Sequence, residues 1–395
     1  MLPSAMVEYH TSKSQQRRFP WLKTFILTCA AMICIKGSAE THSALQAVDS
    51  HGASAWNGTH PFSIRGVIIC SPKEMLDSTP NFLPWNSGAN SGNMGAEWQI
   101  VIQAVDENDF GGTFLWLGQN YGNQPWIRDE ALSYANEAWE EEVTRVSQDP
   151  DTGHIFQAGD YVEVYVRNSL FYGGKRNINE AHNISPDRDF DIHLIEANRG
   201  LPEPAAINLS DLVLPCENDT QTQIDIFDAT RQTGGERYQG TRVRINGLQI
   251  VYADGWDENA SWANRGNNLV TDGENRFFSV RHPLYDLGDA PIGTFDAIGI
   301  INQESGSGTE GTTGYELFIQ EIIQSQTAPT LNLSSDGILS WDSAFADQWI
   351  LEAASAPYGE WTPVSEEPTI IDKRCQLQIL PTEKQSFFRL KIKTK

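Results

Sequence analysis

Four side chains that could bind a metal ion alternate with apolar ones in one short segment: Asp187, Asp189, Asp191 and His193. Because side chains of a strand alternate between its two faces, a strand here would place all four on one face. Carboxylates and an imidazole suit a divalent cation, and Glu180 and His182 lie nearby. The alternative is an ordinary half-buried strand whose polar face meets water. The sequence leaves both interpretations open.

A second acidic segment, DPDTG at 149–153, carries half of a calcium-loop pattern without the later ligands, and we interpret it as a turn. No motif for a nucleophile elbow, a phosphate-binding loop or an HExxH zinc helix occurs in the sequence. His282 precedes a proline at a predicted strand end, and we interpret it as structural. We therefore expect no catalysis. The alternative is a metal-dependent hydrolase or a nuclease-associated protein.

Aromatic residues in polar loops are the other candidate binding groups. Trp256 and Trp262 lie in the polar loop ADGWDENASW, and Tyr121 and Trp126 belong to the many aromatic residues of the first part of the chain. Exposed rings stack on sugars and on nucleic-acid bases, so these four residues predict a binding surface. The alternative is that the two loop tryptophans fold back and cover one end of a barrel, because tryptophan is buried in most proteins.

The N-terminus has the order of a secretory signal. Basic residues precede a largely apolar run at 25–35, which is followed by Gly37-Ser38-Ala39. The run is too short for the about 20 residues that span a bilayer, so we expect cleavage of residues 1–39 rather than a membrane anchor. Residues 40–61 lack apolar periodicity and predict a flexible leader. The mature protein is then secreted, periplasmic or on the cell surface, without a membrane span.

The chain is strongly acidic, with a net charge of -24, and loss of residues 1–39 would make it more negative by four. Such a field repels phosphate backbones, so bulk nucleic-acid binding is disfavoured.

Three cysteines would remain after loss of residues 1–39. Cys70 and Cys216 each end a similar apolar run, and an oxidising compartment would permit a disulfide between them. Buried free thiols are the alternative.

Residues 237–321 form four short β-type runs, each closed by Gly, Pro, Asn or Asp, which is the pattern of a small barrel. Residues 62–204 predict strands at 64–70, 97–105, 113–117, 161–167 and 190–195, and a helix over 127–146. We therefore divide the chain into a first lobe at 62–204 and a second lobe at 205–324.

Three phrases carry a family resemblance: YQGTRVRING at 238–247, LVTDG at 269–273 and AIGI at 297–300. They resemble the OB-fold-like modules of uncharacterised secreted bacterial proteins. The Asp-Gly pair supplies the positive backbone angles that a two-residue hairpin requires. The first lobe carries a weaker version in GDYVEV at 159–164 and FYGGKRNIN at 171–179. The resemblance implies two OB-like lobes, and it implies fold better than function.

Residues 329–395 contain six short alternating segments and predict a small β-sandwich. The pattern of LSW, WILE, WTPV and FFRL resembles the fibronectin type III-like module found at the end of many secreted bacterial proteins. The expected fold is thus mainly β: two OB-like barrels followed by this sandwich. The expected function is extracellular binding or adhesion, directed at a carbohydrate such as a polysaccharide, with no cofactor required beyond the candidate divalent cation.

Overall fold

The computed structural model confirms a mainly β protein, with 43% strand and 8% helix among the residues that it describes. It describes the chain in these ranges: 38–83, 95–120, 133–179, 188–217, 220–252, 256, 268–288, 290–291, 293–306, 311–324, 329–343, 346, 349–356, 359–379 and 387–392. By its contacts, the chain from Lys36 to Lys395 is one compact unit. None of the helices in these ranges has the length and apolar character needed to cross a membrane.

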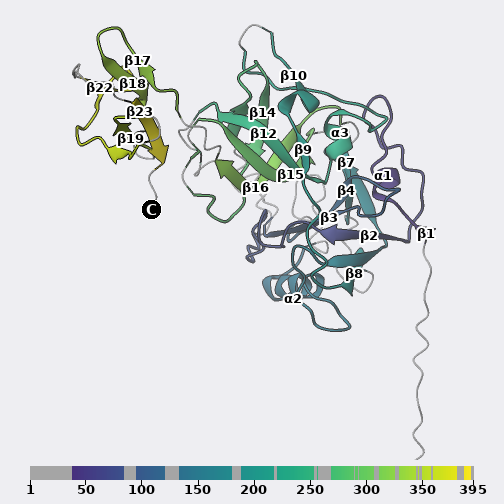
Figure 1. Ribbon diagram of the computed structural model, residues 1–395. Helices are drawn as coiled ribbons and strands as arrows, with labels where there is room; N and C mark the ends of the chain where they lie inside the picture. Colours follow the sequence, from purple (N-terminus) through teal and green to yellow (C-terminus); the bar gives the residue numbers. More distant parts are fainter. Residues whose placement is uncertain are drawn as a thin grey trace, which may run out of the picture. The chain divides into compact units, whose positions relative to one another are not determined.

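The first sheet contains eight strands in the order β6-β7-β4-β3-β2-β5-β8, with β1 paired to β2 (Figure 1). Neighbouring strands of this path are antiparallel except for β4 and β7. The strands are β1 (Ser38–Ala39), β2 (Phe62–Ile68), β3 (Glu97–Gln103), β4 (Gly112–Gly118), β5 (Tyr161–Val166), β6 (Ser169–Tyr172), β7 (Lys175–Ile178) and β8 (Phe190–Glu196).

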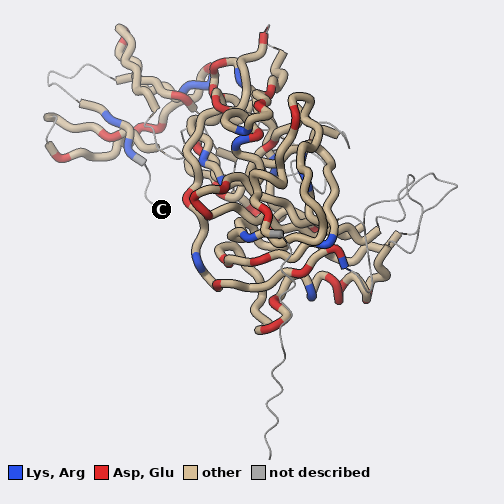
Figure 2. Tube along the Cα trace, turned by 90° about the vertical axis from the view of Figure 1, so that its right-hand side faces the viewer, with Lys and Arg blue, Asp and Glu red and all other residues tan. Residues whose placement is uncertain are grey.

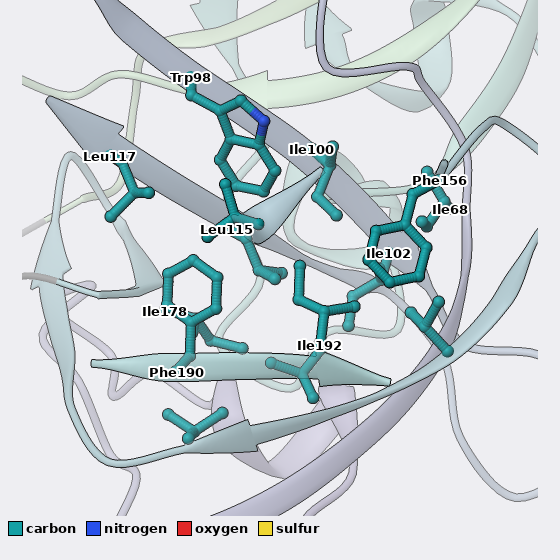
Figure 3. Packing of buried hydrophobic residues seen from close by; sticks show 14 of the residues in the cluster. Ile68, Trp98, Ile100, Ile102, Leu115, Leu117, Phe156, Ile178, Phe190 and Ile192 are labelled. Atoms are coloured by element: carbon teal, nitrogen blue, oxygen red, sulfur yellow. The ribbon is translucent and has the colours of Figure 1, made fainter. Parts of the chain in front are cut away.

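The core of the first lobe follows from strict alternation in these strands. In β3, Trp98, Ile100 and Ile102 point inward, and Figure 3 shows them facing Leu115 of β4 and Phe190 of β8. Helix α2 (Asn136–Val146) lies beside β8 in Figure 1 and adds buried apolar side chains to the same core. The expected helix is therefore present but begins later than predicted, while residues 127–132 lie outside the described ranges.

The second sheet closes into a five-stranded barrel. The path β13-β14-β16-β15-β12 returns to β13, because β12 also pairs with β13. Strands β14 and β16 are parallel, and the other barrel pairs are antiparallel. The strands are β12 (Arg242–Ile250), β13 (Asn268–Thr271), β14 (Phe277–Arg281), β15 (Phe295–Gln303) and β16 (Tyr315–Gln324).

Short elements complete the second lobe. Strand β9 (Ala205–Ile207) extends the sheet by pairing in parallel with β12. The pair β10 (Val213–Leu214) and β11 (Ile224–Asp225) follows the 3-10 helix Leu209–Asp211 and precedes α3 (Gly234–Tyr238). Side chains from β12 to β16 fill the barrel, so this lobe has a core of its own.

Two smaller sheets form the C-terminal sandwich around buried Trp341, Trp349 and Leu390. Their strand orders are β17-β18-β22-β21 and β20-β19-β23. The strands are β17 (Asn332–Leu333), β18 (Ile338–Asp342), β19 (Trp349–Ala354), β20 (Thr362–Pro363), β21 (Thr369–Ile371), β22 (Arg374–Gln378) and β23 (Phe387–Ile392).

The two lobes share a third apolar cluster. It joins Val101 and Phe114, on the outer faces of β3 and β4, to Ile300 and Phe318 of the second lobe. Each of these four side chains is at most 2% exposed. Burial of such side chains contributes about 1.5–3 kcal/mol each. The apolar contact between the lobes therefore stabilises their association.

Backbone contact between two glycines lies next to this cluster. A Cβ atom added to Gly112 would stand 1.9 Å from the carbonyl oxygen of Gly240. The Gly112 amide donates to the Gln239 carbonyl at 3.0 Å, and the Arg242 amide donates to the Gln103 side chain at 2.9 Å. Only glycine allows the two chains to approach this closely. The junction therefore depends on these positions having no side chain.

Residues 40–61 are not the flexible leader that the sequence predicted. Thr41 caps helix α1 (His42–Leu45), and the amides of His42 and Ser43 donate to the Asp109 carboxylate at 2.8 and 2.9 Å. The His42 ring is fully buried and makes hydrogen bonds to Thr113 and to the Arg65 carbonyl. Hydrogen bonds hold this segment in place. They leave no apolar period in the sequence, so the sequence did not reveal its ordered structure. The secretory signal predicted at residues 1–39 lies outside the described ranges except for its last two residues, which form strand β1.

A buried polar group ties this N-terminal segment to the second lobe. Arg231 donates to the Ser43 carbonyl at 3.2 Å, and its guanidinium lies over the Phe110 ring of the first lobe. Its neighbour Glu236 accepts a 2.7 Å hydrogen bond from the Tyr315 hydroxyl. Burial raises the pKa of Glu236 to about 7, although Tyr315 and Arg231 act in the opposite direction.

The cysteines do not form the expected disulfide. Cys70, Cys216 and Cys375 are buried, and none of the three is in a disulfide. Cys70 lies in the cluster between the lobes, whereas the Cys216 amide donates to the Asn275 carbonyl, beside the turn from β13 to β14. Their similar positions after apolar runs did not imply that they are neighbours. Burial raises the pKa of the Cys70 thiol well above its ordinary value.

We predict that Gly112→Ala lowers the free energy of unfolding by at least about 3 kcal/mol, because the new methyl group meets backbone that cannot move aside. Gly153→Ala is the control, since Gly153 has open space around it and a φ of +72°. It should cost only about 1 kcal/mol of backbone strain. Equilibrium urea unfolding of both variants measures the difference, and equal costs would contradict the close approach at the junction.

We also predict a pH effect from Glu236. Its folded-state pKa is raised, so its stabilising contribution is complete below pH about 4.5 and is lost as the pH rises to about 7. The loss amounts to roughly 3 kcal/mol. Glu236→Gln should remove this part of the pH dependence, whereas exposed Glu107→Gln should not. Unfolding free energies across this range test it, and parallel profiles for wild type and Glu236→Gln would refute it.

Candidate functional site

The residues predicted to bind a metal have different partners in the structure. Asp191 is ion-paired with Arg167 and, at 3.0 Å, with Arg145. Asp189 precedes β8, is buried, and accepts a hydrogen bond from Asn168 at 3.3 Å. Two arginines neutralise Asp191, so its pairing opposes the role of metal ligand. This part of the prediction is corrected.

His193 has different neighbours. Its Nδ1 atom lies 3.5 Å from Oδ2 of Asp151, and Asp149 belongs to the same group of possible metal ligands. The sequence predicts only a turn at 149–153. The remaining predicted ligands, Glu180, His182 and Asp187, lie outside the described residues.

The aromatic prediction also changes. Trp256 is 1% exposed and packs in the barrel core, where its ring makes an edge contact with His282 at 4.5 Å. It therefore covers the barrel interior and is not an exposed stacking ring. Tyr121, Trp126 and Trp262 lie outside the described ranges.

The outer face of β3 and β4 carries an aromatic residue that the sequence reading did not select. Strand register places Gln99 opposite Trp116, and Val101 opposite Phe114. Val101 and Phe114 are buried against the second lobe, whereas Trp116 is only half-buried and packs at the edge of that cluster. The second lobe thus covers one part of this face, and Trp116 marks the border of the remainder.

Polar groups surround Trp116 on the first lobe. Its indole donates to the Glu97 carboxylate at 3.1 Å, and the Asn179 amide donates to its carbonyl oxygen. Gln99 is 8% exposed and Asn179 is fully buried. The Gln99 amide nitrogen and the Asn179 amide oxygen have no hydrogen-bond partner within the described chain. A buried amide usually finds a partner, so the Gln99 nitrogen could donate a hydrogen bond to a ligand or to water, and the Asn179 oxygen could accept one.

This arrangement combines a partly buried indole with one unpartnered amide donor and one unpartnered amide acceptor. It offers stacking and hydrogen bonding to a ligand with both apolar and hydroxyl surfaces. The signal in the sequence was the alternation of EWQIVIQ at 97–103, whose outward residues are mostly polar. Alternation alone could not say which outward residues the second lobe would cover.

Charge around the lobes is predominantly negative, with 52 acidic and 28 basic residues in the chain. In Figure 2, the Lys and Arg positions of the described residues are scattered among acidic ones. Several arginines are committed to ion pairs, including Arg281 with Glu316 at 2.5 Å and Arg244 with Asp296 at 2.6 Å. This distribution does not resemble the basic stripe typical of nucleic-acid binding.

Comparison with known proteins found nothing similar: no family model, no curated protein and no solved structure matches the chain.

Proposed function

We propose that this is an exported, non-catalytic binding protein whose lobes are OB-like and whose ligand is a carbohydrate. The strand order of the closed barrel supports the OB-like assignment. Counted along the chain, its strands follow the order 1-2-3-5-4 around the barrel, and the third and fifth are parallel. That order is the one expected of an OB-type Greek-key barrel.

The first lobe supports the same assignment in an open form. Its strands β4, β3, β2, β5 and β8 follow the order 3-2-1-4-5, and helix α2 lies between the third and fourth of them. The two sheets of residues 329–392 have the orders of an immunoglobulin-type sandwich, A-B-E-D and C′-C-F, which fits a fibronectin type III-like module.

The single observation that carries the binding function is the Trp116 surface. OB-type barrels hold oligosaccharides and oligonucleotides on the face of their second and third strands. In the first lobe these are β3 and β4, where Trp116 lies beside the unpartnered Gln99 amide. The net charge of -24 opposes a polyanion, so a neutral oligosaccharide is the better ligand.

The hydrolase alternative has less support. It required Asp189, Asp191 and His193 to converge on one cation, but Asp191 is bound by two arginines. Export and a surface location rest on the N-terminal sequence pattern and stay part of the proposal.

We predict that Trp116→Ala weakens binding of neutral oligosaccharides at least about tenfold, which corresponds to ~1.4 kcal/mol. A glycan array selects the probe, and titration calorimetry compares wild type with Trp116→Ala and Gln99→Ala. Trp361→Ala is the matched control, because Trp361 is partly exposed in the C-terminal module and contacts Arg389.

Thermal unfolding must first show that the variants are folded, since Trp116 also packs against the cluster between the lobes. Equal affinity of wild type and both variants would contradict the site. Tight, steeply salt-dependent binding of single-stranded DNA in the same assay would contradict the ligand class.

A further inference from the structure

Two separate segments of the first lobe bring three metal-binding side chains together. Asp149 and Asp151 belong to the turn after α2, and His193 belongs to β8. Each offers one ligand atom, and these atoms all lie within 4.8 Å of one another. Within the described ranges, this is the one group of three or more such side chains.

The Asp149 carboxylate is held in a fixed position between the two segments. Its Oδ1 atom accepts the Leu194 amide of β8 at 2.8 Å. Its Oδ2 atom accepts the amide and the hydroxyl of Thr152 at 2.9 and 2.7 Å. A carboxylate has about four lone-pair sites, so one site on Oδ1 is left for a further partner.

Asp149 also lacks a permanent counter-charge. It is 2% exposed, and none of the arginines or lysines in the described chain forms an ion pair with it. Buried Glu142 is different, because Arg145 and Arg188 pair with it. Buried carboxylates are normally paired or bound to a metal.

We propose that Asp149, Asp151 and His193 bind one divalent cation, which neutralises Asp149 and connects the turn to β8. A mixed set of two carboxylates and one imidazole suits Zn²⁺ or Mn²⁺ better than Ca²⁺, which takes six to eight oxygen ligands. Water completes the coordination.

The geometry requires only a small adjustment. Neighbouring ligand atoms of a tetrahedral Zn²⁺, at about 2.0–2.2 Å from the metal, lie roughly 3.4 Å apart. Nδ1 of His193 and Oδ2 of Asp151 are already 3.5 Å apart, and all three ligand atoms lie within 4.8 Å of one another, so any wider pair must close to the tetrahedral distance. Asp151 can supply this movement, because 63% of its side chain is exposed. Glu163, opposite His193 in the sheet, is held at 2.8 Å by Arg65 and need not take part.

Calorimetric titration of the chelator-treated full chain with Zn²⁺, Mn²⁺ and Ca²⁺ tests the site. We expect one equivalent of Zn²⁺ or Mn²⁺ to bind and to raise the unfolding temperature, since metal that binds only the folded protein stabilises it. Asp151→Asn and His193→Gln should each weaken binding at least tenfold. Both positions are solvent-accessible, so the variants should fold. His51→Gln and Asp336→Asn are the matched controls at other accessible positions and should bind as wild type does.

Three results would overturn the proposal. The first is no heat and no thermal stabilisation of the wild type at millimolar metal. The second is binding that Asp151→Asn and His193→Gln leave unchanged, which would place the metal elsewhere. The third is a preference for Ca²⁺ over both transition metals, which would refute the assigned class. Carbohydrate binding at Trp116 is independent of each outcome.

Discussion

The close approach of Gly112 and Gly240 is the constraint on which the arrangement of the two lobes depends. Two backbones in contact bring β4 and the start of β12 close enough for direct hydrogen bonds. That distance in turn lets Phe114 and Val101 meet Ile300 and Phe318 without a gap. A side chain at either glycine would separate both the polar and the apolar contacts. The N-terminal segment then adds a further connection, through Asp109 and Arg231.

The same junction determines which surface is left for binding. The face of β3 and β4 would serve as one continuous ligand surface if the first lobe stood alone. The second lobe covers the Val101–Phe114 part of it and leaves the Gln99–Trp116 part at the border. The loop after β15 takes part in this contact, because Glu304 pairs with buried Lys175 at 2.6 Å. The proposed binding surface and the packing of the lobes thus share one sheet face.

The sequence predicted the elements better than their contacts. Alternation in EWQIVIQ and the Asp-Gly pair at 272–273 are local signals, and they indicated real strands. The two-residue hairpin expected from Asp-Gly was wrong, because Thr271 pairs with Phe277 and the connection spans residues 272–276. The sequence did not predict the ordered structure of residues 40–61, because that structure depends on hydrogen bonds to Asp109 and Thr113, which are distant in the sequence.

The sequence did not reveal the neighbours of the candidate site residues for the same reason. The neighbours of Asp191 and His193 are set by α2 and by the turn after it, not by β8 itself. Trp256 appeared to be a loop residue, yet the barrel had room for its ring. A pattern within one strand can show which side chains share a face. It cannot show what other segment packs against that face.

Native-state hydrogen exchange tests most directly whether the two lobes act as one body. The amides of Gly112, Leu284 and Ser305 donate across the junction to Gln239, Glu74 and Gly173. If the lobes open only when the protein unfolds, these amides should exchange with the same free energy as amides inside the barrel strands. Exchange with a much smaller free energy at all three, while the barrel amides stay protected, would show that the lobes separate in the native protein.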